Sequence, residues 1–214
     1  MNCQNNPSED TKADQSACLK VVGPHLLARG FRDYERYSVR FSRHGSSPVH
    51  FERDVLRCGP VVGVLALDLE RDEVVLTRQF RLGAFLVNRE NDTLEIVAGR
   101  IDPGEDAATA ARRECFEEIG VEARQLRPVM QLAPAPAWSD ETMTLFVAVV
   151  DAHNLPARAG ASHEHEEIAV VRYKVDAAIG LVGQKLVQSA PTIVALQWLK
   201  LNRDSIPTLL ETAA

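Results

Sequence analysis

The stretch from Gly99 to Val121 constrains this chain more than any other. Within it, residues that can start and end a helix flank an unusual cluster of charged side chains. Asp106 can cap the start of a helix, the alanines that follow favour helix, and Gly120 can end it in a left-handed conformation. On such a helix three carboxylates share an arc of about 100°: Glu114, Glu117 and Glu118. The sequence therefore predicts a helix between Asp106 and Gly120 with an acidic side.

Beside the acidic arc the same helix carries small and apolar residues that can pack on a sheet, namely Ala108, Ala111, Cys115 and Ile119. The carboxylates repel one another by a few tenths of a kcal/mol for each close pair, so the cluster needs a cationic partner. Oxygen ligands suit a hard ion such as Mg²⁺. The stretch predicts a metal site beside a buried helix face.

This stretch resembles the Nudix box, the signature motif of the Nudix hydrolases. Seven fixed positions of the motif are present: Gly99, Glu105, Arg113, Glu114, Glu117, Glu118 and Gly120. Cys115 and Val121 occupy its apolar positions. Such a match arises by chance on the order of once in 10⁸ windows. An acidic solvated helix face, the usual meaning of a charge run, explains neither the glycines nor the spacing of Glu105 and Arg113.

Composition narrows the class of protein. With 214 residues and 45% hydrophobic content, the chain can bury the core of one domain with an appendage. A net charge of −6 argues against a general nucleic-acid or membrane-surface binder. The four cysteines lack metal-ligand spacing, and we see neither a transmembrane segment nor a secretory leader. These features favour a cytoplasmic protein with reduced thiols.

Three segments are expected along the chain. Residues 1–17 are polar and aperiodic and predict a disordered leader. Residues 18–57 alternate like strands and predict a small N-terminal antiparallel β subdomain, and residues 58–214 form the hydrolase domain. Strands interleaved with helices predict an α/β class with a mixed sheet. The resemblance implies the Nudix fold, in which helices sandwich that sheet as α/β/α layers.

Two local expectations concern the hydrolase domain. Residues 83–92 are expected to form a loop. A closing helix over residues 191–202 is expected to bury the stripe Ile193, Leu196, Leu199 and Leu201.

Pro136 and the segments 78–84, 164–168 and 192–199 extend the resemblance beyond the box. They resemble the ADP-ribose pyrophosphatase branch of the family, and this wider resemblance covers roughly residues 26–202. It implies that the metal is held by the carbonyl of Ala98 and by Glu114 and Glu118, with Glu117 beside them as a ligand and catalytic group. Mg²⁺ is the expected ion, with Mn²⁺ as the alternative. Glu105 and Arg113 are expected to orient the loop and the helix, and Gly99 and Gly120 to serve structure.

Glu164 matches the catalytic base of the family, within the acidic segment 163–167. Glu166 and Glu167 lie close enough in sequence to be alternatives for this role. The neighbouring His163 and His165 are expected to be ordinary loop residues rather than metal ligands.

Several positions match the substrate contacts of the branch. Arg53 and Arg81 are expected to bind phosphates, since a guanidinium pairs well with a pyrophosphate, although each could be a surface arginine on a strand. Phe31 matches an aromatic that stacks on adenine from the partner subunit, although most single aromatics are core residues. Pro136 matches a proline of the substrate loop. The family usually has two glycines after it, whereas this chain has Ala137 and Trp138. Either the pocket for the terminal ribose is expected to be smaller, or Trp138 is expected to stack on a different group.

Taken together, these residues predict a homodimeric, Mg²⁺-dependent hydrolase that cleaves ADP-ribose to AMP and ribose 5-phosphate. A pyrophosphatase for another nucleoside diphosphate sugar, such as GDP-mannose, is the alternative within the branch. A sensor that binds ADP-ribose without turnover is the alternative of another class.

Overall fold

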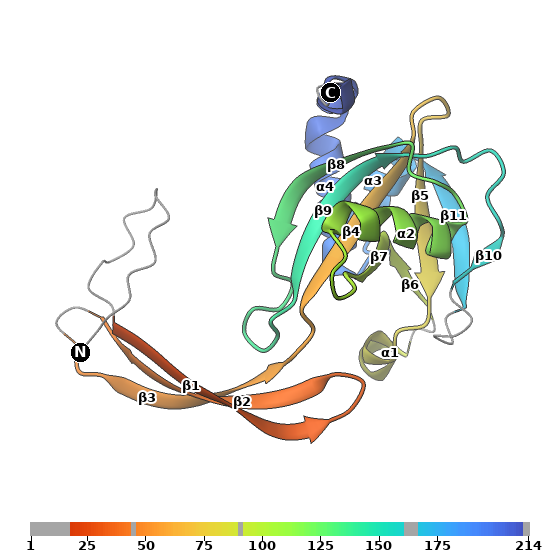
Figure 1. Ribbon diagram of the computed structural model, residues 1–214. Helices are drawn as coiled ribbons and strands as arrows, with labels where there is room; N and C mark the ends of the chain where they lie inside the picture. The colour runs from red at the N-terminus through yellow and green to blue at the C-terminus, as the bar shows by residue number, and fades with distance from the viewer. Residues whose placement is uncertain (1–17, 44–45, 90–91, 161–166, 212–214) are drawn as a thin grey trace. The chain divides into compact units, whose positions relative to one another are not determined.

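The computed structural model describes residues 18–43, 46–89, 92–160 and 167–211, and its backbone contacts divide into two compact units (Figure 1). The N-terminal unit reaches to Gly59 and also contains Ala135–Glu141, a loop from much later in the chain. The larger unit holds Pro60–Pro134 and the chain from Thr142 onward. The predicted leader, residues 1–17, lies outside the described residues.

The N-terminal unit is a three-stranded antiparallel sheet in the order β1-β2-β3. Its strands are β1 (Cys18–Arg29), β2 (Asp33–Ser42) and β3 (Val49–Leu56). Among its described residues this unit contains no helix, and every residue of β1 is exposed. Leu19 is 63% exposed and Val22 is 56% exposed, so the sheet has little apolar core of its own within this chain.

The larger unit contains an eight-stranded mixed sheet in the order β10-β11-β5-β4-β9-β8, with β6 paired to β5 and β7 paired to β4. Strands β4 and β9 run parallel, and the other pairs are antiparallel. The strands are β4 (Pro60–Asp68), β5 (Glu73–Gln79), β6 (Thr93–Glu95), β7 (Val97–Arg100), β8 (Gln125–Leu132), β9 (Thr142–Val149), β10 (Arg158–Ala159) and β11 (Ile168–Lys174).

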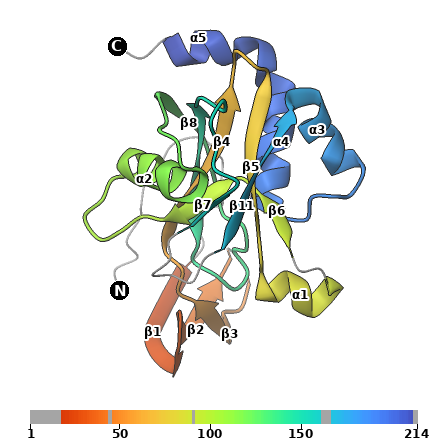
Figure 2. The same ribbon diagram turned by 90° about the vertical axis from the view of Figure 1, so that its right-hand side faces the viewer.

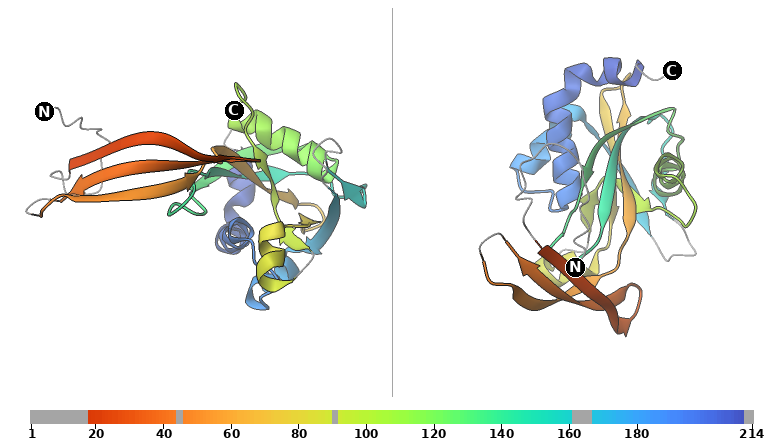
Figure 3. Two further views of the ribbon diagram at one scale, coloured as in Figure 1. Left: turned by 90° about the horizontal axis from the view of Figure 1, so that it is seen from below. Right: turned by 60° about the vertical axis from the view of Figure 1, so that its left-hand side comes forward.

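Strand β4 lies at the centre and is buried on both faces, as its continuous apolar run predicts. Val62, Val64 and Ala66 belong to the core under α2 (Ala107–Ile119). Leu65 and Leu67 belong to the opposite core, which α3 (Val175–Gly183) and α4 (Ala190–Asn202) cover. Figure 2 and the right-hand view of Figure 3 show α2 on one face of the sheet and α3 and α4 on the other. The expected α/β/α layers are confirmed.

Helix α2 begins and ends where the sequence predicts. The Asp106 carboxylate accepts hydrogen bonds from the backbone N–H groups of Ala108 and Thr109, and Gly120 closes the helix with a φ of 72°. The buried side differs from the predicted stripe, because Ala108 is exposed and Ala110 takes its place. Glu114 and Glu118 are also buried, so the acidic arc does not lie beside the packed face but forms part of it.

Other local expectations need correction. The segment expected as a loop over residues 83–92 contains α1 (Leu82–Asn88), and a helix α5 (Ile206–Glu211) follows a 3-10 turn (Arg203–Ser205). Both helices are short, which makes their periodicity hard to recognise. Leu201, predicted to be buried, is 81% exposed. No helix in the described part of the chain is long and apolar enough to span a membrane.

Leu199 and Leu201 provide a test of the packing in α4. Leu199 is 1% exposed and belongs to the core under α3 and α4, so Leu199→Ala should lower the free energy of unfolding by about 2–5 kcal/mol. Leu201→Ala, on the exposed side of the same helix, should change it by less than about 0.5 kcal/mol. Urea unfolding followed by circular dichroism measures both. Equal losses in the two variants would contradict the packing of α4.

Candidate metal and substrate site

The backbone of Ala98 and the side chain of Glu118 meet where β7 passes under α2. The N–H of Ala98 donates to Glu118 Oε2 at 3.1 Å. Ala98 faces Gly63 across the antiparallel pair of β7 with β4. Because the N–H and C=O of one residue in an antiparallel pair point the same way, the Ala98 carbonyl also points away from β4. The predicted backbone ligand therefore lies on the edge of β7 that faces the Glu118 carboxylate.

Gly99 lets this strand pass close to the Glu114 carboxyl group. A Cβ atom at Gly99 would lie 1.9 Å from the Glu114 Cδ and Oε1 atoms, so no side chain fits there without moving Glu114. Glu114 itself is 8% exposed. The first glycine of the motif thus creates the room for a buried carboxylate.

Arg113 connects most of the acidic residues through its guanidinium group. Its Nε and Nη2 donate to the two oxygens of Glu105 at 3.1 and 2.9 Å, and Nη2 also donates to the Arg100 carbonyl at 2.8 Å. Its Nη1 donates to Glu114 Oε1 at 2.7 Å and to Glu117 Oε2 at 2.9 Å. These bonds use all five N–H donors of the side chain.

Glu105 in turn fixes the loop that precedes α2. The N–H of Asp102 donates to Glu105 Oε2 at 3.1 Å, and the N–H of Glu105 donates to the Asp102 carbonyl at 2.9 Å. Hydrogen bonds from Arg113 hold the pKa of Glu105 below its usual value, against the opposing effect of burial. This geometry supports the orienting role expected for Glu105 and Arg113.

The far end of α2 is held by Gly120 and by a loop of the same unit. Gly120 adopts a left-handed conformation, and a Cβ atom there would lie 2.7 Å from the Pro156 ring. The N–H of Gly160 donates to the Glu117 carbonyl at 3.0 Å. The helix is therefore tied at its C-terminal end to the segment that leads toward residues 161–166.

Cys115 lies between the carboxylates in sequence but serves packing. Burial, with a further contribution from the charges of Glu118 and Glu114, raises the pKa of its thiol to about 12. A thiol with this pKa stays protonated near neutral pH, and only the thiolate ligates metals well. The oxygen atoms around it remain the candidate ligands.

The charge of this cluster fits a divalent cation. Among the described residues, no three His, Cys, Asp or Glu side chains converge in a geometry that would hold a metal by themselves. Glu105, Glu114, Glu117 and Glu118 nevertheless carry four negative charges against the single positive charge of Arg113, which leaves three in excess. Two of these carboxylates are buried, where unbalanced charge is costly. Carboxylates and an edge carbonyl are the donors that Mg²⁺ prefers.

Most of the residues considered for the catalytic base lie outside the described part of the chain. Glu164, Glu166, His163 and His165 fall outside the described residues. Glu167 is described, and its carboxylate forms an ion pair with Arg158, the first residue of β10.

Arg81 lies just before α1 and is held by a residue that the sequence analysis did not identify. Its Nη2 donates to Glu95 Oε2 at 2.8 Å, and its Nε donates to the same oxygen at 3.1 Å. The Glu95 side chain is only 13% exposed, and its residue is the last of β6, three positions before Ala98. Glu95 thus fixes an arginine predicted to bind phosphate. No local pattern in the sequence distinguishes Glu95 from an ordinary acidic residue of a strand, so only the fold reveals this pair.

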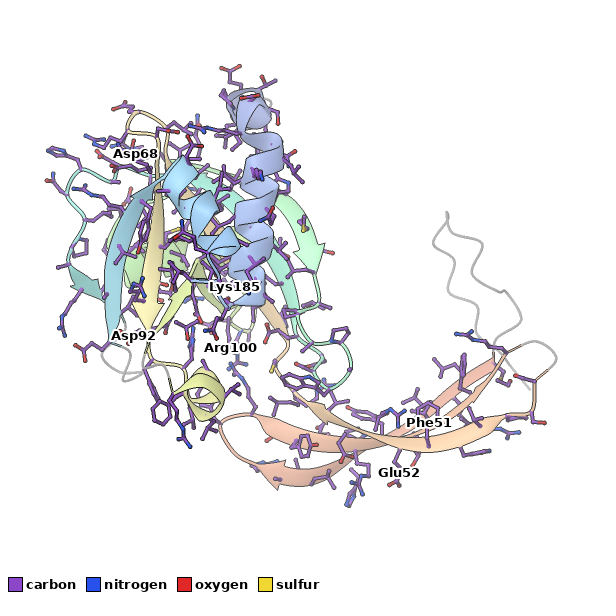
Figure 4. All side chains as sticks on the ribbon, turned by 180° about the vertical axis from the view of Figure 1, so that it is seen from behind. Phe51, Glu52, Asp68, Asp92, Arg100 and Lys185 are labelled. Carbon is purple, nitrogen blue, oxygen red and sulfur yellow. The ribbon has the colours of Figure 1, made fainter. Side chains whose placement is uncertain are left out.

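The other predicted substrate contacts belong to the N-terminal unit. Phe31 is 92% exposed in the turn after β1, and the Arg32 guanidinium lies 4.6 Å from its ring centroid. The Arg53 guanidinium lies 4.4 Å from the ring centroid of Phe51, which is labelled on β3 in Figure 4. Pro136 and Trp138 are exposed in the loop 135–141, with 57% of Trp138 accessible. Phe31 is therefore not a core residue of this chain.

Known proteins resemble this chain over most of its length. The profile of the NUDIX domain family matches residues 59–196. The chain is 30% identical to an ADP-ribose pyrophosphatase of Escherichia coli over 189 residues, which cover 88% of this chain and 90% of the relative. It is 28% identical to a GDP-mannose pyrophosphatase of Cronobacter sakazakii, over 86% of this chain and 96% of that one.

A solved structure shares the fold. The crystal structure of an ADP compounds hydrolase superposes with a TM-score of 0.66 at 24% identity, and it covers 90% of this chain and 98% of its own. The family profile spans well over half of the chain, and its matched region contains the whole Gly99–Val121 motif. This chain is a member of the Nudix family.

Proposed function

We propose that this protein is a metal-dependent Nudix hydrolase that cleaves ADP-ribose to AMP and ribose 5-phosphate. The observation that carries the chemistry is the cluster of Glu105, Glu114, Glu117 and Glu118 around Arg113, which has three negative charges in excess and in which Glu114 and Glu118 are buried in α2. Nudix hydrolases generally use divalent metal ions. The substrate is supported by 30% identity to an ADP-ribose pyrophosphatase over nearly the whole chain.

In this proposal Glu114, Glu118 and the Ala98 carbonyl hold Mg²⁺, with Mn²⁺ as the alternative, and Glu117 completes the set. The bound ion supplies positive charge to the diphosphate and makes an attacking water more acidic. Arg113 holds Glu114 and Glu117 at fixed positions, and the Ala98 N–H holds Glu118. Rigid placement of ligands before substrate arrives is the main catalytic contribution of these residues.

Glu164 is proposed as the group that accepts the proton of the attacking water. Its assignment rests on the resemblance of the segment 163–167 to the acidic loop of the branch. Among the two alternatives, Glu167 is already paired with Arg158, which makes it the weaker candidate. The order of preference is therefore Glu164, then Glu166.

GDP-mannose or a similar nucleoside diphosphate sugar is the alternative substrate. The observation that favours it is the nearly equal identity to relatives of both kinds, 30% and 28%. Trp138 stands where the branch usually has a glycine, and its exposed indole can stack on a base or sugar that a glycine would not contact. Arg53, Arg81, Phe31 and Pro136 are the other proposed contacts.

A panel of nucleoside diphosphate derivatives tests the substrate. With Mg²⁺ present, ADP-ribose should give AMP and ribose 5-phosphate in equal amounts, with a kcat/KM at least about 10-fold above that for GDP-mannose. Chromatography of the released nucleotides provides the measurement. A preference for GDP-mannose would identify the alternative substrate, and tight ADP-ribose binding without product would identify a sensor.

Glu114→Gln and Glu118→Gln test the metal site. Each should lower kcat by at least about 10²-fold, because even the outer partners of metal ligands typically contribute 10–100-fold. The isosteric amides should preserve the fold, which circular dichroism can check. Glu122→Gln, an exposed carboxylate just beyond α2, is the matched control and should retain wild-type rates. Near-wild-type rates in both site variants would rule out the proposed site.

We further propose that the protein is a homodimer in the cytoplasm, in which the N-terminal sheets of two copies cover one another. The family resemblance motivates this arrangement, and exposed apolar side chains on β1, including Leu19 and Val21, support it. Exposed apolar patches of this kind often mark protein interfaces.

Sedimentation equilibrium at micromolar concentration tests the dimer. The wild-type mass should be twice the 23.6 kDa of one chain. The double variant Leu19→Asp, Val21→Asp should shift the protein toward monomer, since buried charge disfavours the interface. Leu201→Asp, which places the same charge on an exposed leucine of α4, should leave the mass unchanged. A wild-type monomer would refute the dimer.

A further inference from the structure

The loop 135–141 joins β8 to β9, yet its contacts belong to the N-terminal unit. The N–H of Leu56, at the end of β3, donates to the Trp138 carbonyl at 2.9 Å, and the N–H of Asp140 donates to the Leu56 carbonyl at 3.4 Å. Leu56 and Ser139 form a parallel β-bridge. The loop thus pairs with the end of β3 through a single β-bridge.

The side chain of Asp140 strengthens this pairing. Its Oδ1 accepts hydrogen bonds from the backbone N–H groups of Cys58 at 2.7 Å and Gly59 at 3.1 Å. Its Oδ2 lies 3.2 Å from the Nε of Arg57. Burial by itself would raise the pKa of Asp140, but the donors on Gly59 and Cys58 and the charge of Arg57 outweigh it and hold the pKa below its usual value.

Arg57 extends this network into β2. Its Nη1 donates to the Tyr37 hydroxyl at 3.1 Å, and that hydroxyl donates to the Glu35 carboxylate at 2.7 Å. The Arg57 Nε also lies 3.5 Å from the same Glu35 oxygen. Tyr37 is the cross-strand partner of Arg53, the predicted phosphate ligand on β3. A continuous chain of polar contacts therefore runs from the loop to the strand pair that carries Arg53.

We propose that Asp140 is a positioning residue for substrate selection, because it anchors the loop of Pro136 and Trp138 to the sheet that carries Arg53. Two groups expected to contact different parts of the substrate are then held as one body. The contacts of Asp140 with Arg57, Cys58 and Gly59 lie within the N-terminal unit, whereas the proposed metal ligands belong to the larger unit. We therefore expect Asp140 to act on substrate binding and not on the chemical step. This inference rests on the proposed function.

Asp140→Asn tests the anchor. The amide keeps the shape of the side chain but loses the charge that pairs with Arg57, so we expect KM for ADP-ribose to rise about 5- to 20-fold, the range of a lost charge-assisted hydrogen bond. The kcat should stay within about 3-fold of the wild-type value, because the variant loses binding energy that the bound substrate and the transition state share equally. The preference for ADP-ribose over GDP-mannose should also fall.

Asp54→Asn is the matched control. Asp54 lies on β3 of the same unit, is 27% exposed where Asp140 is 28% exposed, and pairs with Arg36 instead of with the loop. Breaking that pair should leave KM within about 2-fold of the wild-type value, because it is an ordinary ion pair of the sheet.

A second readout reports on the loop itself. The chain has two tryptophans, Trp138 and Trp198, so Trp198→Phe leaves Trp138 as the single fluorescent probe. In that background Asp140→Asn should increase quenching of Trp138 by iodide, and Asp54→Asn should not. Should Asp140→Asn fail to fold, Arg57→Gln keeps the backbone bonds of Asp140 and should raise KM in the same direction by a smaller factor.

The outcomes separate the inference from the proposed function. Wild-type hydrolysis of ADP-ribose with an unchanged KM and selectivity in Asp140→Asn would overturn the inference and leave the function intact. A loosened loop without any change in KM would overturn it as well. Hydrolysis of GDP-mannose in place of ADP-ribose would correct the proposed substrate, and the comparison of KM would then decide the inference with GDP-mannose.

Discussion

The candidate active site depends on one guanidinium group. Arg113 donates all five of its N–H groups, to Glu105, Glu114, Glu117 and the Arg100 carbonyl. Without this cation, carboxylates on the buried side of α2 would repel one another at a cost that a 13-residue helix could not offset by propensity alone. Because Arg113 carries a single charge, the cluster remains strongly acidic. The same residue thus makes the cluster compatible with folding and leaves it attractive to a divalent cation.

The sequence was most informative where local chemistry decides the structure. Asp106 and Gly120 set the limits of α2, and the apolar run of β4 indicated a strand buried on both faces. It was misleading where polarity was taken to mean exposure. Glu114 and Glu118 pack toward β7 because Arg113 and the Ala98 N–H satisfy them, and this rotates the buried side of α2 from Ala108 toward Ala110. Such pairings depend on neighbouring groups, and the helical periodicity of the sequence contains no information about them.

Contacts between segments far apart in the chain could not be predicted from the sequence. Glu95 is an ordinary acidic residue of a short strand until the fold places it against Arg81. Asp140 lies more than eighty residues from Cys58 and Gly59, and nothing local indicates that its carboxylate binds their N–H groups. Helix α1 lacks a side-chain cap and has only seven residues, too few for a periodic pattern to stand out.

The division into two units suggests how selectivity can change while the chemistry is kept. The proposed metal ligands lie in the unit with two buried cores, where substitutions of buried side chains strongly lower the free energy of unfolding. Phe31, Arg53, Pro136 and Trp138 lie in the unit that has little core of its own, and these side chains can vary at little cost to stability. Overall identity to the ADP-ribose pyrophosphatase is 30% and to the GDP-mannose pyrophosphatase 28%, so it does not discriminate between the two substrates. We therefore expect the choice between these substrates to depend on the proposed contacts in the N-terminal unit, with Trp138 foremost among them, together with Arg81 in the larger unit.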